Sequence, residues 1–117
     1  MADAVVTIFH NPNCGTSRNV LAALRERNLE PEVVEYLKTG WTRPQLQGLL
    51  KAMNARPRDV LRTRGTPAEA MGINADSTDQ AILDAMVAEP ILVERPIVVT
   101  PKGTALCRPA DRLETLL

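Results

Sequence analysis

A strand, a tight turn and a helix, with a cysteine at the corner, form the stretch that most constrains how this chain folds. The β-branched run at residues 5–9 predicts the strand, and the Asn-Pro-Asn sequence at residues 11–13 predicts the turn. After Cys14, residues 15–27 carry apolar side chains at helical spacing, and residues 32–37 predict a second strand. A strand, helix and strand at this spacing form a βαβ unit, in which the two strands run parallel. The start of the chain therefore predicts an α/β fold organised around the cysteine.

The middle of the chain, at about residues 42–89, has a helical pattern throughout. Hydroxyl side chains and prolines mark the helix starts, and a glycine and a proline mark stops. Starts are predicted at Thr42 with Gln45 as a capping box, at Pro57, at Thr66 and at Ser77 with Gln80, and stops at Gly72 and Pro90. We therefore expect a block of several short helices inserted between the strands.

The last part of the chain returns to β structure. Residues 96–100 and 104–107 predict two strands joined by a Pro-Lys-Gly turn at residues 101–103, which is an antiparallel hairpin. Residues 109–116 predict a final short helix. A chain of 117 residues is long enough to bury a real core as one domain. We expect a single α/β domain over residues 1–117, with a βαβ unit, a β-hairpin and the helical insertion.

Charge and cysteine content exclude several functions. Fourteen Lys and Arg residues balance fourteen Asp and Glu residues, which argues against a general nucleic-acid or membrane-surface binder. No apolar run approaches the length of a transmembrane helix, and residues 1–4 lack the features of a signal peptide. Two separated cysteines, Cys14 and Cys107, and one histidine do not have the spacing of a zinc site or a Cys-x-x-Cys pair. We expect no bound metal and a reducing cytoplasmic location.

Cys14 is placed where a thiol becomes reactive. The first turn of a helix has unpaired backbone N–H groups and a partial positive charge, which favour thiolate over thiol. The backbone N–H groups of Gly15 and Thr16 could also bind an oxyanion, and Gly15 has no side chain to block its approach. The hydroxyl group of Ser17 could donate to the sulfur, and His10 is a candidate for tuning the thiol. The alternatives are a buried structural cysteine and a histidine of the polar surface.

Three arginines have settings that suit anion binding. Arg62 follows an apolar pair at the end of a predicted short helix, Arg95 precedes the third strand, and Arg108 follows the fourth. If the hairpin lies beside the first strand, Arg95 and Arg108 come to neighbouring strand ends. Guanidinium groups there would neutralise an anionic substrate that the thiolate has to attack. From spacing alone, ordinary surface positions for all three explain the sequence about as well.

The segment around Cys14 resembles a known family. Residues 10–19 (His-Asn-Pro-Asn-Cys-Gly-Thr-Ser-Arg-Asn) closely resemble the active-site loop of the glutaredoxin-coupled arsenate reductases. Three more segments fit that family in the same order, at residues 60–62, 90–100 and 103–109, so the resemblance covers nearly the whole chain. It implies a thioredoxin-like fold with a helical insertion. In that fold the proline before the third strand, here Pro96, is typically cis and faces the active cysteine.

The resemblance also implies a reaction. Cys14 would attack arsenate and form a covalent thiol–arsenate adduct. Glutathione, as a co-substrate, would then add to the arsenic, and glutaredoxin would remove the mixed species with release of arsenite. We expect no bound cofactor, no nucleic-acid or membrane partner, and a monomeric enzyme.

The functional positions of the family carry over residue by residue. The positions that bind the anion in the family are Arg62, Arg95 and Arg108 here. The positions thought to favour the thiolate are His10 and Ser17. Of the two cysteines, only Cys14 would be essential.

Two other functions remain open on this sequence. A general glutathione-dependent thiol oxidoreductase, such as a deglutathionylating enzyme, also needs a low-pKa cysteine, but it does not require three arginines around the sulfur. A thioredoxin-fold transcription regulator that binds RNA polymerase often carries a Cys-x-x-Cys switch, and here Ser17 takes the second position. A low-molecular-weight tyrosine phosphatase is excluded, because its Cys-x5-Arg motif needs an arginine where Val20 stands.

Overall fold

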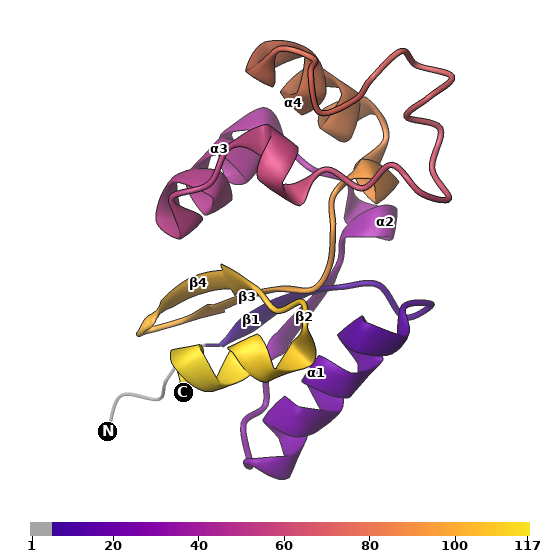
Figure 1. Cartoon of the computed structure of the whole chain (residues 1–117). Helices are drawn as coiled ribbons and strands as arrows, with labels where there is room; N and C mark the ends of the chain where they lie inside the picture. Colours follow the sequence, from indigo (N-terminus) through magenta and orange to yellow (C-terminus); the bar gives the residue numbers. More distant parts are fainter. Residues whose placement is uncertain (1–5) are drawn as a thin grey trace. The chain divides into compact units, whose positions relative to one another are not determined.

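The structure is a computed structural model that describes residues 6–117 and divides into two compact units (Figure 1). One unit contains residues 6–36 and 95–117, and the other is Leu37–Glu94. The second unit contains the helical insertion predicted at residues 42–89. Within the described residues, no helix is long and apolar enough to cross a membrane.

The first unit is built on a four-stranded sheet. Its strands are β1 (Thr7–His10), β2 (Glu32–Glu35), β3 (Ile97–Thr100) and β4 (Gly103–Leu106), in the spatial order β2-β1-β3-β4. β1 pairs in parallel with β2 and antiparallel with β3, and β3 pairs antiparallel with β4. The predicted βαβ unit and the hairpin beside the first strand are confirmed. Val5, which the sequence places in the first strand, lies outside the described residues.

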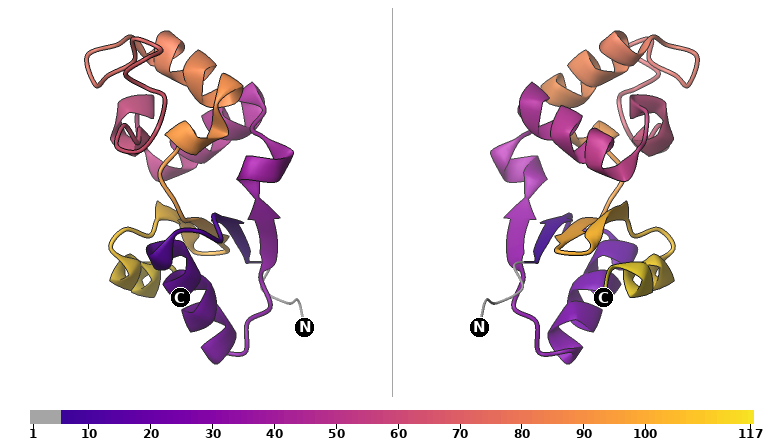
Figure 2. Two further views of the ribbon diagram at one scale, coloured as in Figure 1. Left: turned by 90° about the vertical axis from the view of Figure 1, so that its right-hand side faces the viewer. Right: turned by 90° about the vertical axis from the view of Figure 1, so that its left-hand side faces the viewer.

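Two helices cover the same face of this sheet, α1 (Gly15–Glu26) and the 3-10 helix η3 (Ala110–Leu116) (Figure 2). The helix predicted at the end of the chain is thus present in 3-10 form. One apolar core joins both helices to the strands, and each fully buried Leu or Ile in it contributes about 1.5–3 kcal/mol. Its buried members are Val6, Ile8, Val20, Leu24, Val98, Cys107, Leu113 and Leu116.

The second strand ends earlier than the sequence predicts. Instead of continuing to residue 37, β2 stops at Glu35, and the short helix α2 (Tyr36–Thr39) follows at once. Glu35 is the last residue of β2 that pairs with β1, because β1 ends at His10. A strand without a neighbour has no ladder to continue, so the backbone turns into a helix and Tyr36 is left buried just beyond the sheet.

The second unit consists of short helices. They are α3 (Arg43–Met53), the 3-10 helix η1 (Pro57–Val60), α4 (Asp79–Ala88) and the 3-10 helix η2 (Pro90–Leu92). α3 begins as predicted, because the Thr42 hydroxyl group accepts from the backbone N–H of Gln45 and the Gln45 side chain accepts from that of Thr42. Arg43 of α3 pairs with Asp84 of α4, which joins the two longer helices of this unit.

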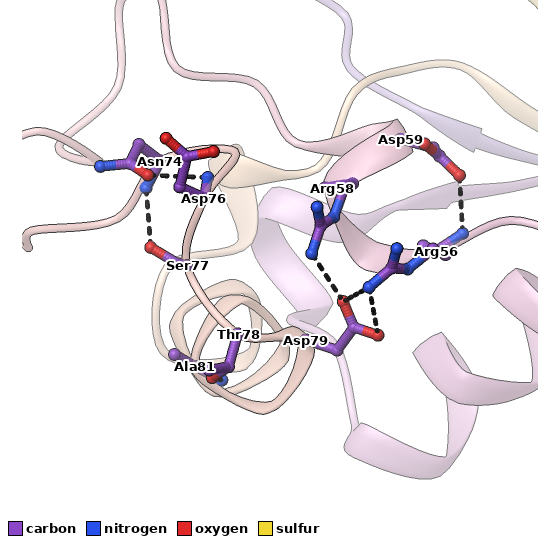
Figure 3. A network of polar contacts seen from close by, with 9 residues as sticks. All are labelled: Arg56, Arg58, Asp59, Asn74, Asp76, Ser77, Thr78, Asp79 and Ala81. Carbon is purple, nitrogen blue, oxygen red and sulfur yellow. Dashed lines mark hydrogen bonds and ion pairs between the residues drawn. The ribbon is translucent and has the colours of Figure 1, made fainter.

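The N-terminus of α4 differs from the predicted one by one residue (Figure 3). The cap is Thr78 rather than Ser77, since the Thr78 hydroxyl group accepts from the backbone N–H of Ala81 at 3.1 Å. The hydroxyl group of Ser77 instead accepts from the backbone N–H of Asn74 at 3.0 Å. Ser77 therefore closes the preceding turn and is not available as the cap.

Two arginines of the segment around η1 meet the first residue of α4, as Figure 3 shows. Nη2 of Arg56 lies 3.3 Å from Oδ1 of Asp79, and Nη2 of Arg58 lies 3.7 Å from the same oxygen. The backbone N–H of Arg56 also donates to the Asp59 carboxylate at 2.8 Å. Partly exposed ion pairs of this kind contribute about 0–1 kcal/mol each, so this cluster aligns η1 with α4 and does not suggest a binding site.

The helix predicted to begin at Thr66 is not formed. Residues 67–72 make hydrogen-bonded turns, and the backbone N–H of Ile73 donates to the carbonyl of Ala68 at 2.9 Å. Gly72 has a φ of 73°, so this six-to-one bond and the left-handed glycine terminate the segment at the predicted stop. The prediction of a helix is wrong here because the stop comes before a second helical turn can form.

Candidate active site

Cys14 lies at the N-terminus of α1, as the sequence predicts. Its backbone N–H donates to the carbonyl of Asn11 at 3.0 Å, which closes a tight turn around Pro12. Its own carbonyl accepts from the backbone N–H of Arg18 at 3.0 Å, and this bond begins the helix. Cys14 is 8% exposed, so the thiol is nearly enclosed by the groups around it.

Arg95 and Arg108 come together at this sulfur. Nη1 of Arg108 lies 3.5 Å from Sγ of Cys14 and also donates to the carbonyl of Arg95 at 3.1 Å. The pairing of β3 with β4 explains the arrangement, because Arg95 stands just before one strand and Arg108 just after the other. The peptide bonds Arg95–Pro96 and Arg108–Pro109 are both cis, which confirms the prediction for Pro96.

Arg95 has hydrogen-bonding capacity that the protein does not use. The residue is 8% exposed, and its Nε and Nη1 atoms have no hydrogen-bond partner. Buried donors are nearly always paired in folded proteins, so two adjacent unpaired ones call for an explanation. Nε and Nη1 lie on different edges of the guanidinium group, and each of these N–H groups can donate to an oxygen of an oxyanion. Arg95 can therefore receive an anion directly beside the thiol.

The surroundings of Cys14 favour its charged form. Burial raises the pKa of the thiol, but the hydrogen bond from Arg95, the backbone N–H of Ser17 and the hydrogen bond from Arg108 together lower it more. The resulting pKa is about 7, against 9.0 for an ordinary cysteine. About half of the protein therefore carries the thiolate at neutral pH.

Ser17 and His10 form a buried pair next to the thiol. The backbone N–H of Asn11 donates to Oγ of Ser17 at 3.1 Å, and Nδ1 of His10 lies 2.6 Å from the same oxygen. Burial lowers the pKa of His10, so the imidazole is neutral at pH 7. The hydroxyl group of Ser17 donates to Nδ1 when the imidazole proton is on Nε2, and Nδ1–H donates to Oγ in the other tautomer. Oγ of Ser17 thus contacts His10 and the backbone of Asn11, and its expected role in stabilising the thiolate stays a prediction.

Gly15 and Thr16 are the first residues of α1 after Cys14. Their backbone N–H groups belong to the first turn, which has no intrahelical acceptors to offer them. A Cβ atom added at Gly15 would meet only Nη2 of Arg18, at 3.8 Å, which is an ordinary contact. The space at Gly15 does not require glycine, and the expected anion-binding role of these two N–H groups stays a prediction.

Arg62 belongs to the second unit. Its Nη1 donates to Oε1 of Glu94 at 2.9 Å, and both side chains are largely buried. Its backbone N–H donates to the carbonyl of Leu92 at 2.8 Å, beside the isolated bridge between Leu61 and Val93. The role of Arg62 as an anion-binding residue stays a prediction.

Sequence reasoning missed two residues beside the thiol, Asn11 and Tyr36. Asn11 is 2% exposed and bonds through its backbone to Cys14 and Ser17. The sequence indicates only that Asn11 belongs to a turn, because an Asn before a proline is typical of turns. Tyr36 resembled a core residue of a strand, and nothing local marked it as a neighbour of the site.

The second cysteine has the opposite environment to the first. Cys107 is fully buried in the core between the sheet and its helices, and burial raises the pKa of its thiol to about 11. It is therefore a protonated core residue at neutral pH. Within residues 6–117, no group of three or more His, Cys, Asp and Glu side chains is placed to hold a metal ion.

The two thiols should differ sharply towards iodoacetamide. Because only the thiolate reacts, we expect the alkylation rate of Cys14 to rise with pH to a midpoint near its pKa of about 7. Cys107 should stay unmodified in the folded protein. Mass spectrometry of peptides from samples quenched at a series of pH values measures both rates. A midpoint for Cys14 near 9.0, the value for an ordinary cysteine, would contradict the role given to the arginines.

Known proteins share this sequence and this arrangement of elements. An arsenate reductase of Synechocystis sp. is 51% identical over 118 residues, covering 100% of this chain and 82% of the relative. The arsenate reductase of Escherichia coli strain K12 is 47% identical over 107 residues, covering 91% of this chain and 76% of the relative. Among solved structures, an arsenate reductase from Vibrio cholerae is 30% identical with a TM-score of 0.91, covering 99% of this chain and 100% of that one.

The similarity to these proteins extends to the fold. The structural match extends over both units, and the arsenate reductases to which it leads have the thioredoxin-like fold that the sequence predicts. The ArsC family matches residues 9–116, which contain both cysteines and all the arginines discussed above. Because this match covers nearly the whole sequence and curated members of the family are about half identical to it, the chain belongs to the ArsC family.

Proposed function

We propose that this protein reduces arsenate to arsenite. The observation that carries the proposal is the pair of unpartnered donors on the buried Arg95, directly beside a thiol whose pKa is about 7. A nucleophile and an oxyanion site in one place suit a reaction in which the thiolate attacks the central atom of an oxyanion. Relatives about half identical to this chain carry the name arsenate reductase, and arsenate is such an oxyanion.

The first step is attack of the Cys14 thiolate on arsenic. A sulfur–arsenic bond forms, and one arsenic–oxygen bond breaks, with the oxygen leaving as water after it takes up protons. Two negatively charged reactants repel each other, and the guanidinium groups of Arg95 and Arg108 offset this repulsion. Arsenic stays in the +5 state in this step, so no electrons have been transferred yet.

The electrons come from thiols outside the chain. Reduction of arsenic from +5 to +3 takes two electrons, which two thiols supply when they form a disulfide. Cys107 is fully buried with a raised pKa, so it is unsuited to serve as the second thiol. Glutathione replaces a second oxygen on arsenic, and a glutaredoxin thiolate then attacks the glutathione sulfur. The new disulfide forms, the electron pair of the broken sulfur–arsenic bond stays on arsenic, and water releases arsenite from Cys14.

The proposal includes the setting of the reaction. Glutathione and glutaredoxin are thiols of the reducing cytoplasm, so we place the protein there as a monomer that needs no bound cofactor. In this scheme His10 and Ser17 support the thiolate, and Arg62 supplies a third cation. The pairing of Arg62 with Glu94 means that an anion would have to compete with this carboxylate for the guanidinium group.

A coupled assay tests this function. The purified protein is mixed with arsenate, glutathione, glutaredoxin, glutathione reductase and NADPH, and the consumption of NADPH is followed. We expect turnover that requires arsenate, glutathione and glutaredoxin together. Turnover that proceeds equally well when thioredoxin and its reductase replace the glutathione system would contradict the proposed electron donor. Turnover with a glutathionylated peptide but none with arsenate would identify a general thiol oxidoreductase instead.

A further inference from the structure

Residues 11–14 form the turn through which the chain enters the helix of the nucleophile. The backbone N–H of Cys14 donates to the carbonyl of Asn11 at 3.0 Å, so Pro12 and Asn13 occupy the two central positions. Turns of type I and type II both close with this bond, and they differ in that the peptide group between the central residues is turned over. Type II needs a positive φ at the second central residue, and Asn13 does not have one, so the turn is not of type II.

The residues of this turn permit both forms. Proline is favoured at the first central position of either type, and asparagine is one of the few residues that accept the left-handed conformation of type II at the second. Two other asparagines of this chain do adopt it, Asn28 with a φ of 61° and Asn54 with a φ of 54°. Hydrogen bonds to the central peptide group therefore have to decide which form the turn takes.

Two hydrogen bonds hold this peptide group, one at each end. Nη1 of Arg18 donates to the carbonyl of Pro12 at 2.9 Å, and the backbone N–H of Asn13 donates to Oδ1 of Asn11 at 2.9 Å. Turning the peptide group over would break both, because its carbonyl and its N–H would then point to the opposite faces of the turn. The second bond lies within the turn, whereas the first comes from α1 and ties the turn to the helix.

The side chain of Arg18 reaches back past Cys14. It contacts Pro12 before the cysteine, and its Nη2 lies 3.8 Å from the position that a Cβ atom on Gly15 would take after the cysteine. Helical side chains tilt towards the N-terminus of their helix, so this direction suits a residue one turn into α1. The sulfur between these contacts lies 3.5 Å from Nη1 of Arg108. A change of turn type would redirect the chain into Cys14 and move the sulfur relative to that donor.

We propose that Arg18 is a positioning residue, which holds the peptide group between Pro12 and Asn13 in one orientation and thereby keeps the sulfur of Cys14 within reach of Arg108. The inference deepens the proposed function and rests on it only for the reaction that the thiol serves. Arg18 acts through the turn and not by binding the substrate. Its contribution depends on one donated hydrogen bond and not on its positive charge alone.

Nuclear Overhauser spectroscopy tests the orientation of the peptide group directly. The Hα atom of Pro12 comes closest to the amide proton of Asn13 when the peptide group is turned over, so the cross-peak between them reports the second turn form. Arg18→Met removes the donor and keeps a good helix former, and we expect it to strengthen this cross-peak. Arg25→Met is the matched control, since Arg25 is also exposed, stands two turns further along α1 and lines the same surface groove. Its cross-peak should equal that of the wild type.

The pH dependence of alkylation by iodoacetamide tests the effect on the thiol. We expect Arg18→Met to raise the midpoint for Cys14 by about half a pH unit, because the thiolate loses part of its contact with Arg108. Repeating the series in 1 M KCl separates this effect from a lost charge, since salt at that concentration screens an exposed charge beyond about 3 Å. The shift should persist in salt, and Arg25→Met should show none.

Asn13→Gly approaches the same turn from the other side. Glycine favours type II at this position while Arg18 stays in place, so we expect the midpoint to rise in this variant too. A wild-type cross-peak or a wild-type midpoint in Arg18→Met, or a shift that disappears in 1 M KCl, would overturn the inference. If these measurements come out as expected and arsenate gives no turnover, the substrate is wrong and the positioning role stands.

Discussion

Cys14→Ser will abolish arsenate-dependent turnover. The hydroxyl group of serine has no base placed to remove its proton, because the groups around Cys14 stabilise a thiolate with a pKa of about 7 and the neighbouring His10 is engaged with Ser17. Loss of a covalent nucleophile lowers kcat by about four orders of magnitude or more. The coupled NADPH assay measures this directly, since the background without enzyme is the only rate that remains.

Cys107→Ser is the matched control for this experiment. Cys107 lies in the apolar core and stays protonated, so its replacement should leave most of the turnover. Burying a hydroxyl group there lowers the free energy of unfolding by about 1–3 kcal/mol, which thermal denaturation would record as a lower Tm. Full activity in both single variants would mean that Cys14 is not the nucleophile.

Arg95→Ala should produce the second-largest effect, on capture of the anion. We expect kcat/KM for arsenate to fall about 100-fold, as when a preorganised donor is removed from an oxyanion site. The midpoint of Cys14 alkylation should also move to higher pH, because the hydrogen bond from Arg95 is the largest influence that lowers the pKa of this thiol. The sign follows from charge, since a cation beside the sulfur favours the thiolate and its removal favours the thiol.

Folding should be affected much less than activity in this variant. Two donors of Arg95 lack partners, so the variant loses little beyond the interaction of this guanidinium group with the Cys14 sulfur, and we expect the free energy of unfolding to change by about 1 kcal/mol. Arg112→Ala, at an exposed position of η3, controls for the loss of one positive charge. Urea denaturation and steady-state kinetics on the two variants separate stability from binding. An unchanged KM and kcat for arsenate in Arg95→Ala would remove this arginine from the site.

Features that depend on near neighbours in the chain were predictable. The strand, turn and helix around Cys14, the capping box at Thr42 and the hairpin after Pro96 all have local signals in turn residues, caps and periodicity. Local signals placed the α4 cap at Ser77 and a helix at Thr66, and both predictions were wrong. In each case a hydrogen bond within a turn competed successfully with the helix.

The sequence by itself determined that a thiol stands at the start of a helix, because the propensities that form a strand, a turn and a helix act within a few residues. Only the tertiary structure decided what surrounds that thiol. Arg95 and Arg108 meet at the sulfur because β3 pairs with β4, and Asn11 and Tyr36 follow the ends of neighbouring strands because β1 and β2 end level with each other. These contacts depend on strand register between distant segments, and register is set by the buried face of the sheet, which no local pattern specifies completely.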